Sequence, residues 1–171
     1  MGFFDFLKKA SAPATPAEPT FPLTLAADAK GTVVAMENIP DEVFAQGILG
    51  KCCGIEPTEG KVFAPVDGEI TQAPDSGHAL GIMGAGGVEV LIHVGVDTVE
   101  MKGDGFSPKV KEGDKVKKGD LLLEMDLDKI AAAGHPAVVI TVVTNTDDFK
   151  DVEVVASGDV EPGADLIKVS K

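Results

Sequence analysis

The sequence predicts an all-β domain, an antiparallel β-sandwich or flattened barrel with a few short helical turns. Short valine-rich runs recur along the chain, and clusters of Gly, Pro and Asp separate them, as is typical of short strands joined by tight turns. Helical spacing is confined to a few brief segments. The chain has 171 residues, 44% of them apolar, which is enough to bury one core of ordinary domain size.

The strand signal is strongest in the runs at residues 31–35, 68–72, 88–95, 121–125, 138–144 and 152–156. One helical turn is expected at 40–45 and another at 128–133, the second ended by Gly134 and Pro136. Many short strands with so little helix favour a sandwich or barrel over the other layered architectures.

The first residues differ in composition from the rest of the chain. Residues 1–10 read as an amphipathic segment, in which Lys8 and Lys9 lie apart from four apolar residues at helical spacing: Phe3, Phe6, Leu7 and Ala10. We expect this segment either to contact a membrane surface weakly or to stay frayed. Residues 11–22 are rich in Pro and Ala and indicate an extended linker. The domain is therefore expected to cover residues 23–171. No apolar run reaches the ~18 residues that a membrane span needs, so we expect a cytoplasmic protein.

The chain is strongly acidic, with 28 Asp and Glu residues against 15 Lys and Arg and a formal net charge of −13. Binding to a polyanion needs a basic surface, so nucleic acid is excluded as a partner. A protein partner with a basic surface fits this charge, as does a strongly hydrated cytosolic protein.

The chain has two cysteines, Cys52 and Cys53, which are neighbours. Vicinal cysteines rarely bridge each other, and no second pair is present to build a disulfide framework or a zinc knuckle. We expect both to be small apolar residues in a reducing cytosol.

Two segments, 64–70 and 109–124, resemble the turns of the barrel-sandwich hybrid found in lipoyl and biotinyl carrier domains. The second segment contains paired Gly-Asp turns, at Gly113 with Asp114 and at Gly119 with Asp120. The resemblance suggests a duplicated sandwich of this type and raises the alternative of a swinging-arm carrier. The nearest candidate lysine, Lys129, follows a predicted strand rather than capping a hairpin, which does not match that motif.

The stretch from Ser76 to Val99 brings two histidines together. The sequence Gly-Ala-Gly-Gly at 84–87 is a strong turn signal between two strand-like runs. In a hairpin centred on Ala85 and Gly86, His78 lies directly opposite His93, with Cβ atoms roughly 4.5–5.5 Å apart on one face. This prediction depends on the register, because a shift of one residue moves one histidine to the other face.

Alternation along the second strand assigns its two faces. Val88, Val90, Ile92, Val94 and Val96 are expected in the core, and the histidines on the more exposed face. Three apolar side chains are expected around the histidines: Leu80, Ile82 and Leu91.

Two opposed imidazoles suggest three kinds of chemistry. They could bind a metal, although a closed zinc site needs more ligands. They could act as acid and base, although no Ser or Cys nucleophile signature accompanies them. Finally, one imidazole could carry a phosphoryl group while the other donates a hydrogen bond to it, because neutral imidazole is nucleophilic near pH 7.

Five motifs together resemble the glucose-type IIA component of the bacterial sugar phosphotransferase system, in its standalone form. They are MENIPDEVF at 36–44, APVDGEI at 64–70, the histidine at 78, HVGVDTV at 93–99 and the K-G-x-G-F motif at 102–106. The resemblance implies that His93 accepts a phosphoryl group on its Nε2 atom from the phosphocarrier HPr. It also implies that His93 passes the group to a sugar-specific IIB domain.

The resemblance also assigns roles to other residues. His78 stabilises the phosphorylated state, and Ser76 supplies a hydroxyl that orients the imidazoles. Asp41 and Asp97 match acidic positions that meet arginine on HPr, and Phe44 matches an apolar interface position. No metal or other cofactor is required, although His78 and His93 could bind zinc opportunistically, with a carboxylate from a partner.

The chain departs from the family pattern at several positions. The segment KCCGIEP at 51–57 lacks the family's commoner Gly-Asp-Gly, and Pro74 and Leu91 stand where enteric members carry phenylalanine. These changes argue against enteric-style control of glycerol kinase, permeases or adenylate cyclase, but leave open a regulatory sensor with the same fold. His135 matches no functional position and is expected in an exposed loop.

Overall fold

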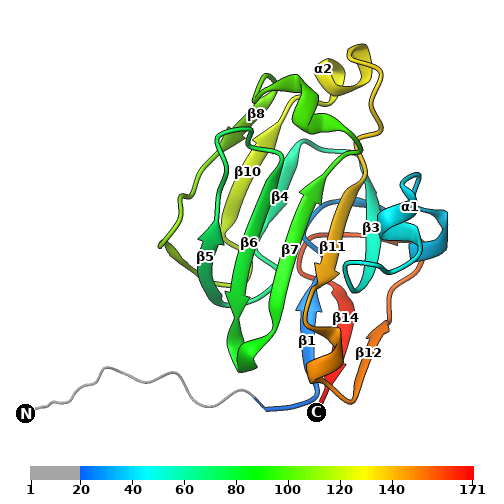
Figure 1. The fold of residues 1–171 in the computed structure, drawn as a ribbon, viewed down its shortest axis with the longest axis vertical. Coiled ribbons are helices and arrows are strands. Elements are labelled where there is room, and N and C mark those ends of the chain that lie inside the picture. The colour runs from blue at the N-terminus through cyan, green and yellow to red at the C-terminus, as the bar shows by residue number, and fades with distance from the viewer. Residues whose placement is uncertain (1–19) are drawn as a thin grey trace, which may run out of the picture.

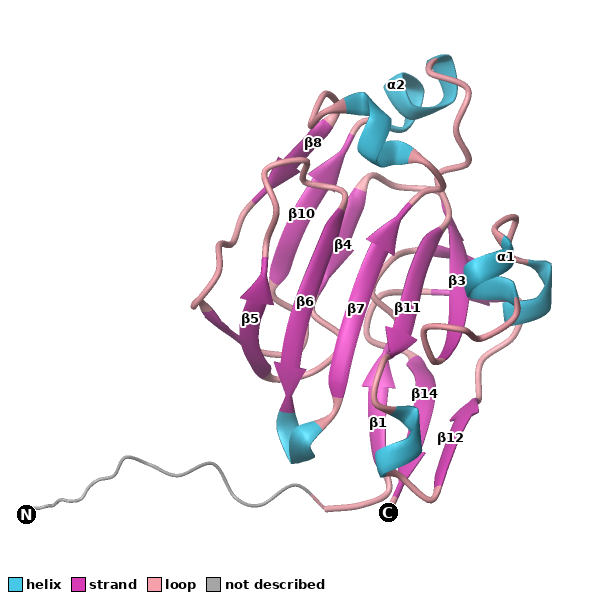
Figure 2. Cartoon of the chain, viewed as in Figure 1, coloured by secondary structure: helices cyan, strands magenta, loops and turns pink. Residues whose placement is uncertain are grey.

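The computed structural model describes residues 20–171, which form a layered antiparallel β-structure with short helices at its periphery (Figures 1 and 2). In chain order the strands are β1 (Leu23–Ala26), β2 (Gly31–Val34), β3 (Lys51–Pro57), β4 (Lys61–Phe63), β5 (Gly68–Gln72), β6 (Ala79–Gly84), β7 (Glu89–Val94), β8 (Phe106–Pro108), β9 (Lys115–Val116), β10 (Leu121–Met125), β11 (Val139–Val143), β12 (Asp151–Val154), β13 (Asp159–Val160) and β14 (Asp165–Ser170). The helices are α1 (Glu42–Ala45) and α2 (Leu127–Ala132), with the 3-10 turns η1 (Met36–Asn38), η2 (Ala85–Gly87), η3 (Thr98–Met101) and η4 (Thr146–Asp148). The all-β prediction is confirmed.

The strands form three sheets in which the recorded pairs are antiparallel. An eight-stranded sheet has the order β13-β2-β3-β11-β7-β6-β5-β9. Two three-stranded sheets have the orders β4-β10-β8 and β1-β14-β12. Figure 1 shows β4 and β10 behind β5, β6 and β7, so the large sheet has an inner face and an outer face.

The inner face of the large sheet packs on the smaller sheets and forms the main apolar cluster. As the alternation predicts, four residues from Val88 onward belong to this inner cluster and are at most 3% exposed: Val88, Val90, Ile92 and Val94. Val96 is also buried, but it joins a second cluster on the outer face. The prediction of one core face for all five was therefore wrong at Val96, because the chain leaves the ladder after Val94.

The second cluster, called here the outer cluster, covers the outer face at β3 and β11. It contains Ile39, Phe44, Cys52, Val96, Val138, Ile140 and Val142, with Val34, Met36 and Leu91 packed at its margin. Figure 1 shows α1 lying beside β3 and β11, and the segment around η1 and α1 supplies Ile39 and Phe44. Every residue of β11 is buried because both faces of this strand are covered. That explains why its sequence, VITVV, is apolar apart from Thr141.

A glycine of β3 leaves room for the Val138 side chain on the outer face of the sheet. Gly54 of β3 pairs with Ile140, and a Cβ there would lie 2.7 Å from Val138 Cγ2 and 3.6 Å from Ile39 Cγ1. The small residues of the segment 51–57 therefore belong to a buried strand, which the valine-rich pattern did not mark.

The predicted elements agree closely with the observed ones. Strands at 68–72 and 121–125 match β5 and β10, and the other four predicted runs differ from β2, β7, β11 and β12 by one or two residues at an end. Helical turns lie where α1 and α2 were expected, and Asp41 and Asp126 cap them by accepting from Val43 and Lys129 backbone N–H groups. The amphipathic segment at 1–10 and linker residues 11–19 lie outside the described residues.

The hairpin joining β6 and β7 corrects the predicted register. Its loop is the three-residue turn η2, with Gly86 in the left-handed region at φ 72°, rather than a two-residue turn. One extra loop residue shifts the ladder by one, so His93 pairs with Ala79 and not with His78. Among the described residues, no helix combines the length and apolar composition needed to cross a bilayer.

Candidate functional site

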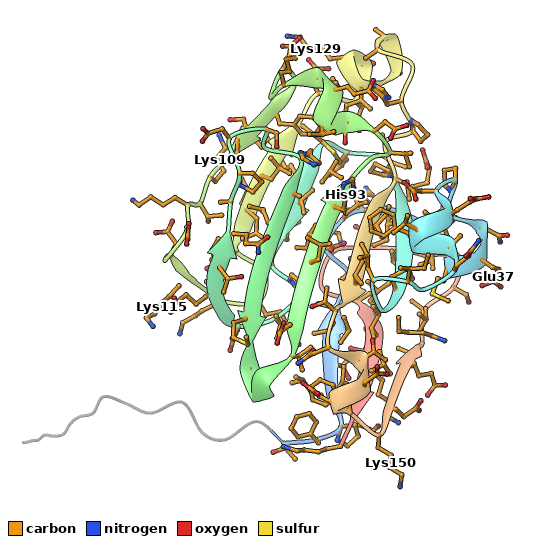
Figure 3. The ribbon with its side chains drawn as sticks, viewed as in Figure 1. Glu37, His93, Lys109, Lys115, Lys129 and Lys150 are labelled. Atoms are coloured by element: carbon orange, nitrogen blue, oxygen red, sulfur yellow. The ribbon has the colours of Figure 1, made fainter. Side chains whose placement is uncertain are left out.

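His93 lies near the end of β7, beside β11 and close to α1 (Figure 3). Its Nδ1 lies 2.9 Å from the carbonyl oxygen of Gly95. A carbonyl oxygen can only accept, so Nδ1 carries the proton and donates to it. Nε2 of the neutral imidazole is therefore the nitrogen with a free lone pair.

The Gly95 carbonyl is held by a backbone conformation that suits glycine. Gly95 has φ +80°, and a Cβ there would lie 2.4 Å from Thr98 Cγ2 and 2.7 Å from the Pro136 carbonyl oxygen. This turn brings the chain back under the imidazole within two residues. This acceptor is not predicted from the sequence, although Gly95, two residues after the histidine, is its signal.

His78 reaches the same place from the other side of the hairpin, although it is not directly opposite His93. It lies in a bend just before β6, outside the regular ladder, and Val94 N–H donates to its carbonyl oxygen at 2.7 Å. Because the backbone bends there, the two imidazole rings meet edge to face, with centroids 5.0 Å apart at 83°. The predicted pair is thus formed, by a different backbone geometry from the one inferred.

Ser76 contacts the second histidine. Its Oγ lies 2.7 Å from His78 Nδ1, within a turn in which Gly77 N–H donates to the Pro74 carbonyl at 3.0 Å. Gly77 has φ +70°, and a Cβ there would lie 2.9 Å from Phe106 Cβ. The turn therefore fixes both Ser76 and His78.

Burial lowers the pKa of both histidines. For His93 the burial effect is opposed by the hydrogen bond to Gly95 and by the charges of Asp41 and Asp97, which raise the pKa. For His78, burial has the larger effect, and the nearby His93 lowers the pKa further. Both side chains are thus neutral at pH 7, the state in which imidazole is nucleophilic.

The two predicted acidic residues lie near His93 on separate elements. Asp41 is half-buried at the start of α1, and Asp97 is exposed just before η3 with φ 61°. Figure 3 labels several lysines, and these lie at the edges of the molecule, away from His93. Asp41 and Asp97 therefore supply negative charge beside His93.

The apolar surroundings of His93 differ in part from those predicted. The Phe44 ring centroid lies 5.1 Å from that of His93, and Leu91 is half-buried at the margin of the outer cluster. Leu80 and Ile82 do not belong to the site: they are 1% and 2% exposed, within the inner cluster. Their placement follows from the register shift, which sets them opposite inward residues of β7.

A sequence model of the family described as "phosphoenolpyruvate-dependent sugar phosphotransferase system, EIIA 1" matches residues 23–149. The chain belongs to this EIIA family. Its motifs around both histidines lie within the matched residues, so the resemblance stated from the sequence is confirmed.

Relatives of this EIIA chain are both fused and separate. It is 45% identical over 146 residues to the β-glucoside-specific EIIBCA component of Dickeya chrysanthemi, matching 85% of this chain but 23% of that protein. It is 45% identical over 133 residues to the glucose-specific EIIA component of Halalkalibacterium halodurans, matching 78% of this chain and 77% of that protein. The chain thus spans about a quarter of the length of the fused relatives.

A solved structure has the same fold. The glucose permease IIA from Mycoplasma capricolum matches 87% of this chain and 96% of its own, with a TM-score of 0.76 and 32% identity.

The geometry favours neither a closed metal site nor a swinging-arm carrier. The described residues place no third His, Cys, Asp or Glu with the two imidazoles, so a tetrahedral metal would need ligands from elsewhere. Lys129, the candidate for a swinging arm, lies in α2 and pairs with Asp104 at 2.9 Å rather than standing at a hairpin tip.

Proposed function

We propose that this EIIA chain is a phosphocarrier that accepts a phosphoryl group on His93 Nε2 from phospho-HPr and transfers it to a sugar-specific IIB domain. The observation that carries the proposal is the hydrogen bond from His93 Nδ1 to the Gly95 carbonyl. It places the proton on Nδ1 and leaves Nε2 as the nucleophile. The EIIA family assignment supports the same chemistry.

The transfer exchanges one N–P bond for another. The lone pair of His93 Nε2 attacks phosphorus, the Nε2–P bond forms, and the bond to the donor histidine of HPr breaks with its electron pair returning to that nitrogen. No oxidant or metal is needed, because the two carriers are chemically alike. The protein mainly has to align the groups and exclude water.

His78 and Ser76 complete the site in this proposal. When the Ser76 hydroxyl donates to His78 Nδ1, the remaining proton of His78 lies on Nε2. That N–H can donate to an oxygen of the phosphoryl group on the neighbouring ring, whose centroid is 5.0 Å away. His78 thus stabilises the phosphorylated state and supports onward transfer.

The docking surface for HPr and for IIB is the acidic and apolar area around His93. Asp41 and Asp97 supply negative charge to meet a basic partner, and Phe44 and Leu91 supply apolar contact. A docked partner that covers this area removes water from the imidazole. Rim charges of this kind act mainly on association rate.

The test is a relay assay with purified HPr and a phosphoenolpyruvate-driven donor. His93→Gln should take up no label, and His78→Gln should be labelled but fail to pass the group to a IIB domain. His135→Gln is the matched control, since it alters the third of the chain's 3 histidines, and should behave as wild type. Persistent acid-labile labelling of His93→Gln would refute the proposal.

A further inference from the structure

The vicinal cysteines lie on opposite faces of β3. Cys52 belongs to the outer cluster and Cys53 to the inner cluster, and both are 0% exposed. Successive side chains of a strand point to opposite faces, so the two thiols are separated by the sheet and are free. Only Cys52 is on the side of the histidines.

The Cys52 thiol makes a specific contact with α1. Its Sγ lies 3.4 Å from the carbonyl oxygen of Phe44, to which it donates. Burial raises the pKa of Cys52 to about 11, so the thiol keeps its proton at neutral pH and remains a donor. The contact ties the last turn of α1 to the sheet.

Helix α1 depends on such contacts for its position. It has 4 residues, far below the ~12–15 that an isolated helix needs for stability in water. The Phe44 carbonyl also accepts from Gly47 N–H at 3.0 Å, which closes the helix end locally. Cys52 adds a hydrogen bond from the sheet to the same carbonyl.

Phe44 connects Cys52 to His93. Across the sheet, Cys52 pairs with Val142 and His93 pairs with Ile140, so one strand, β11, lies between the two residues. Phe44 spans this distance: its carbonyl contacts Cys52, and its ring centroid lies 5.1 Å from that of His93.

We propose that Cys52 is a positioning residue of the EIIA site, whose thiol holds the end of α1 on the sheet and thereby keeps the Phe44 ring against His93. The inference rests on the proposed role of His93 as phosphoryl carrier. It assigns a function to the cysteine on the outer face and none to its neighbour.

Loss of the thiol should affect His93 in two ways. A looser Phe44 ring exposes the imidazole to water, so the lowered pKa of His93 should move up towards its ordinary value. Phospho-His93 should also hydrolyse faster. We expect a lifetime shortened about three- to tenfold, because exclusion of water is what protects the N–P bond from hydrolysis.

The experiment compares Cys52→Ala, Cys52→Ser and Cys53→Ala in the full chain. The pKa of His93 is followed by NMR titration without any partner, and the lifetime of phospho-His93 is followed after labelling through HPr. Cys53→Ala is the matched control, equally buried on the inner face, and should leave both values at wild type while lowering stability. Cys52→Ser keeps a hydroxyl donor and should fall between wild type and Cys52→Ala.

A double-mutant cycle with Phe44→Ala separates positioning from general destabilisation. If Cys52 acts through Phe44, removing the thiol has no further effect on the His93 pKa in the Phe44→Ala background. Wild-type values of pKa and lifetime in folded Cys52→Ala or, should that variant not fold, in Cys52→Val, which fills the site without a donor, would overturn the inference. Failure of wild type to be labelled on His93 would instead refute the phosphocarrier function, and the titration would still decide the role of Cys52.

Discussion

A buried acid in the inner cluster makes the stability of this domain depend on pH. Asp28 lies between β1 and β2 and is 0% exposed. Its Oδ2 accepts from the Thr141 hydroxyl at 2.5 Å, whereas its Oδ1 has no hydrogen-bond partner within the described chain. Cys53 is the titratable group facing it from β3, and it supplies no positive charge. Burial therefore dominates and raises the pKa of Asp28 from 3.8 to about 7.

The sign of the effect follows from which state binds the proton. Between pH 3.8 and about pH 7, the folded chain keeps the proton on Asp28 and the unfolded chain has lost it. The free energy of unfolding therefore falls as pH rises through this window, and it is flat below and above it. A shift of this size corresponds to about 4 kcal/mol in total, of which about 3 kcal/mol is lost between pH 5 and pH 8.

Asp28→Asn tests this directly, because the amide keeps the shape and the acceptor for Thr141 but cannot ionise. Urea unfolding at several pH values is followed by far-UV circular dichroism, since the chain has no Trp or Tyr for fluorescence. Wild type should lose about 3 kcal/mol more than the variant between pH 5 and pH 8. Asp147→Asn, at an exposed aspartate, is the matched control and should follow wild type.

Comparing variant with wild type removes the contributions of other groups. His78 and His93 have lowered pKa values in the folded chain, so they act in the opposite direction and stabilise the fold as pH rises. Both are present in wild type and in Asp28→Asn, and their effect cancels in the difference. Parallel pH profiles of the two proteins from pH 5 to pH 8 would refute the reasoning about Asp28.

Three further predictions concern the site. Gly95→Ala forces a side chain into the left-handed conformation that orients the acceptor of His93 Nδ1. The rate of labelling in the relay assay should therefore fall at least tenfold, which corresponds to a barrier raised by about 1.4 kcal/mol. Asp41→Asn keeps the helix cap but removes a charge that raises the pKa of His93, so NMR titration should show a still lower pKa for His93. The rate of phosphorylation by HPr, measured by stopped flow, should also depend less on salt. Leu80→Ala should cost about 2–5 kcal/mol of unfolding free energy in urea with little change in relay rate, whereas Leu91→Ala should slow the relay with a smaller loss of stability.

The hairpin shows how far the sequence alone could predict the site. Its glycine turn and two strands were apparent, and so was the meeting of His78 with His93. The register was not, because Gly-Ala-Gly-Gly is compatible with a two-residue or a three-residue loop, and η2 has three. The imidazoles still meet because His78 precedes the ladder, in a bend that alternation does not describe.

Other features could not be read from the sequence because they depend on which segments pack together. Nothing in the sequence around Asp28 shows that it is buried against Thr141, a residue 113 positions away. The strand at 51–57 lacks the valine-rich pattern, and on its outer face Gly54 leaves room for the Val138 side chain, which comes from a segment far along the chain. In both cases the physical cause is long-range packing rather than local propensity.

The two faces of the large sheet have different tasks: the inner face stabilises the fold, and the outer face holds the side chains of the phosphoryl-transfer site. On β7, Ile92 and Val94 point into the inner cluster, while Leu91 and His93 lie on the outer side with Phe44. A substitution that leaves a cavity on the inner face lowers the unfolding free energy, because that cluster joins all three sheets. A substitution on the outer face changes how α1 and the imidazoles are held. The two faces should therefore respond separately, with stability variants on one and relay variants on the other, which is why Cys53 and Leu80 are suitable controls for Cys52 and Leu91.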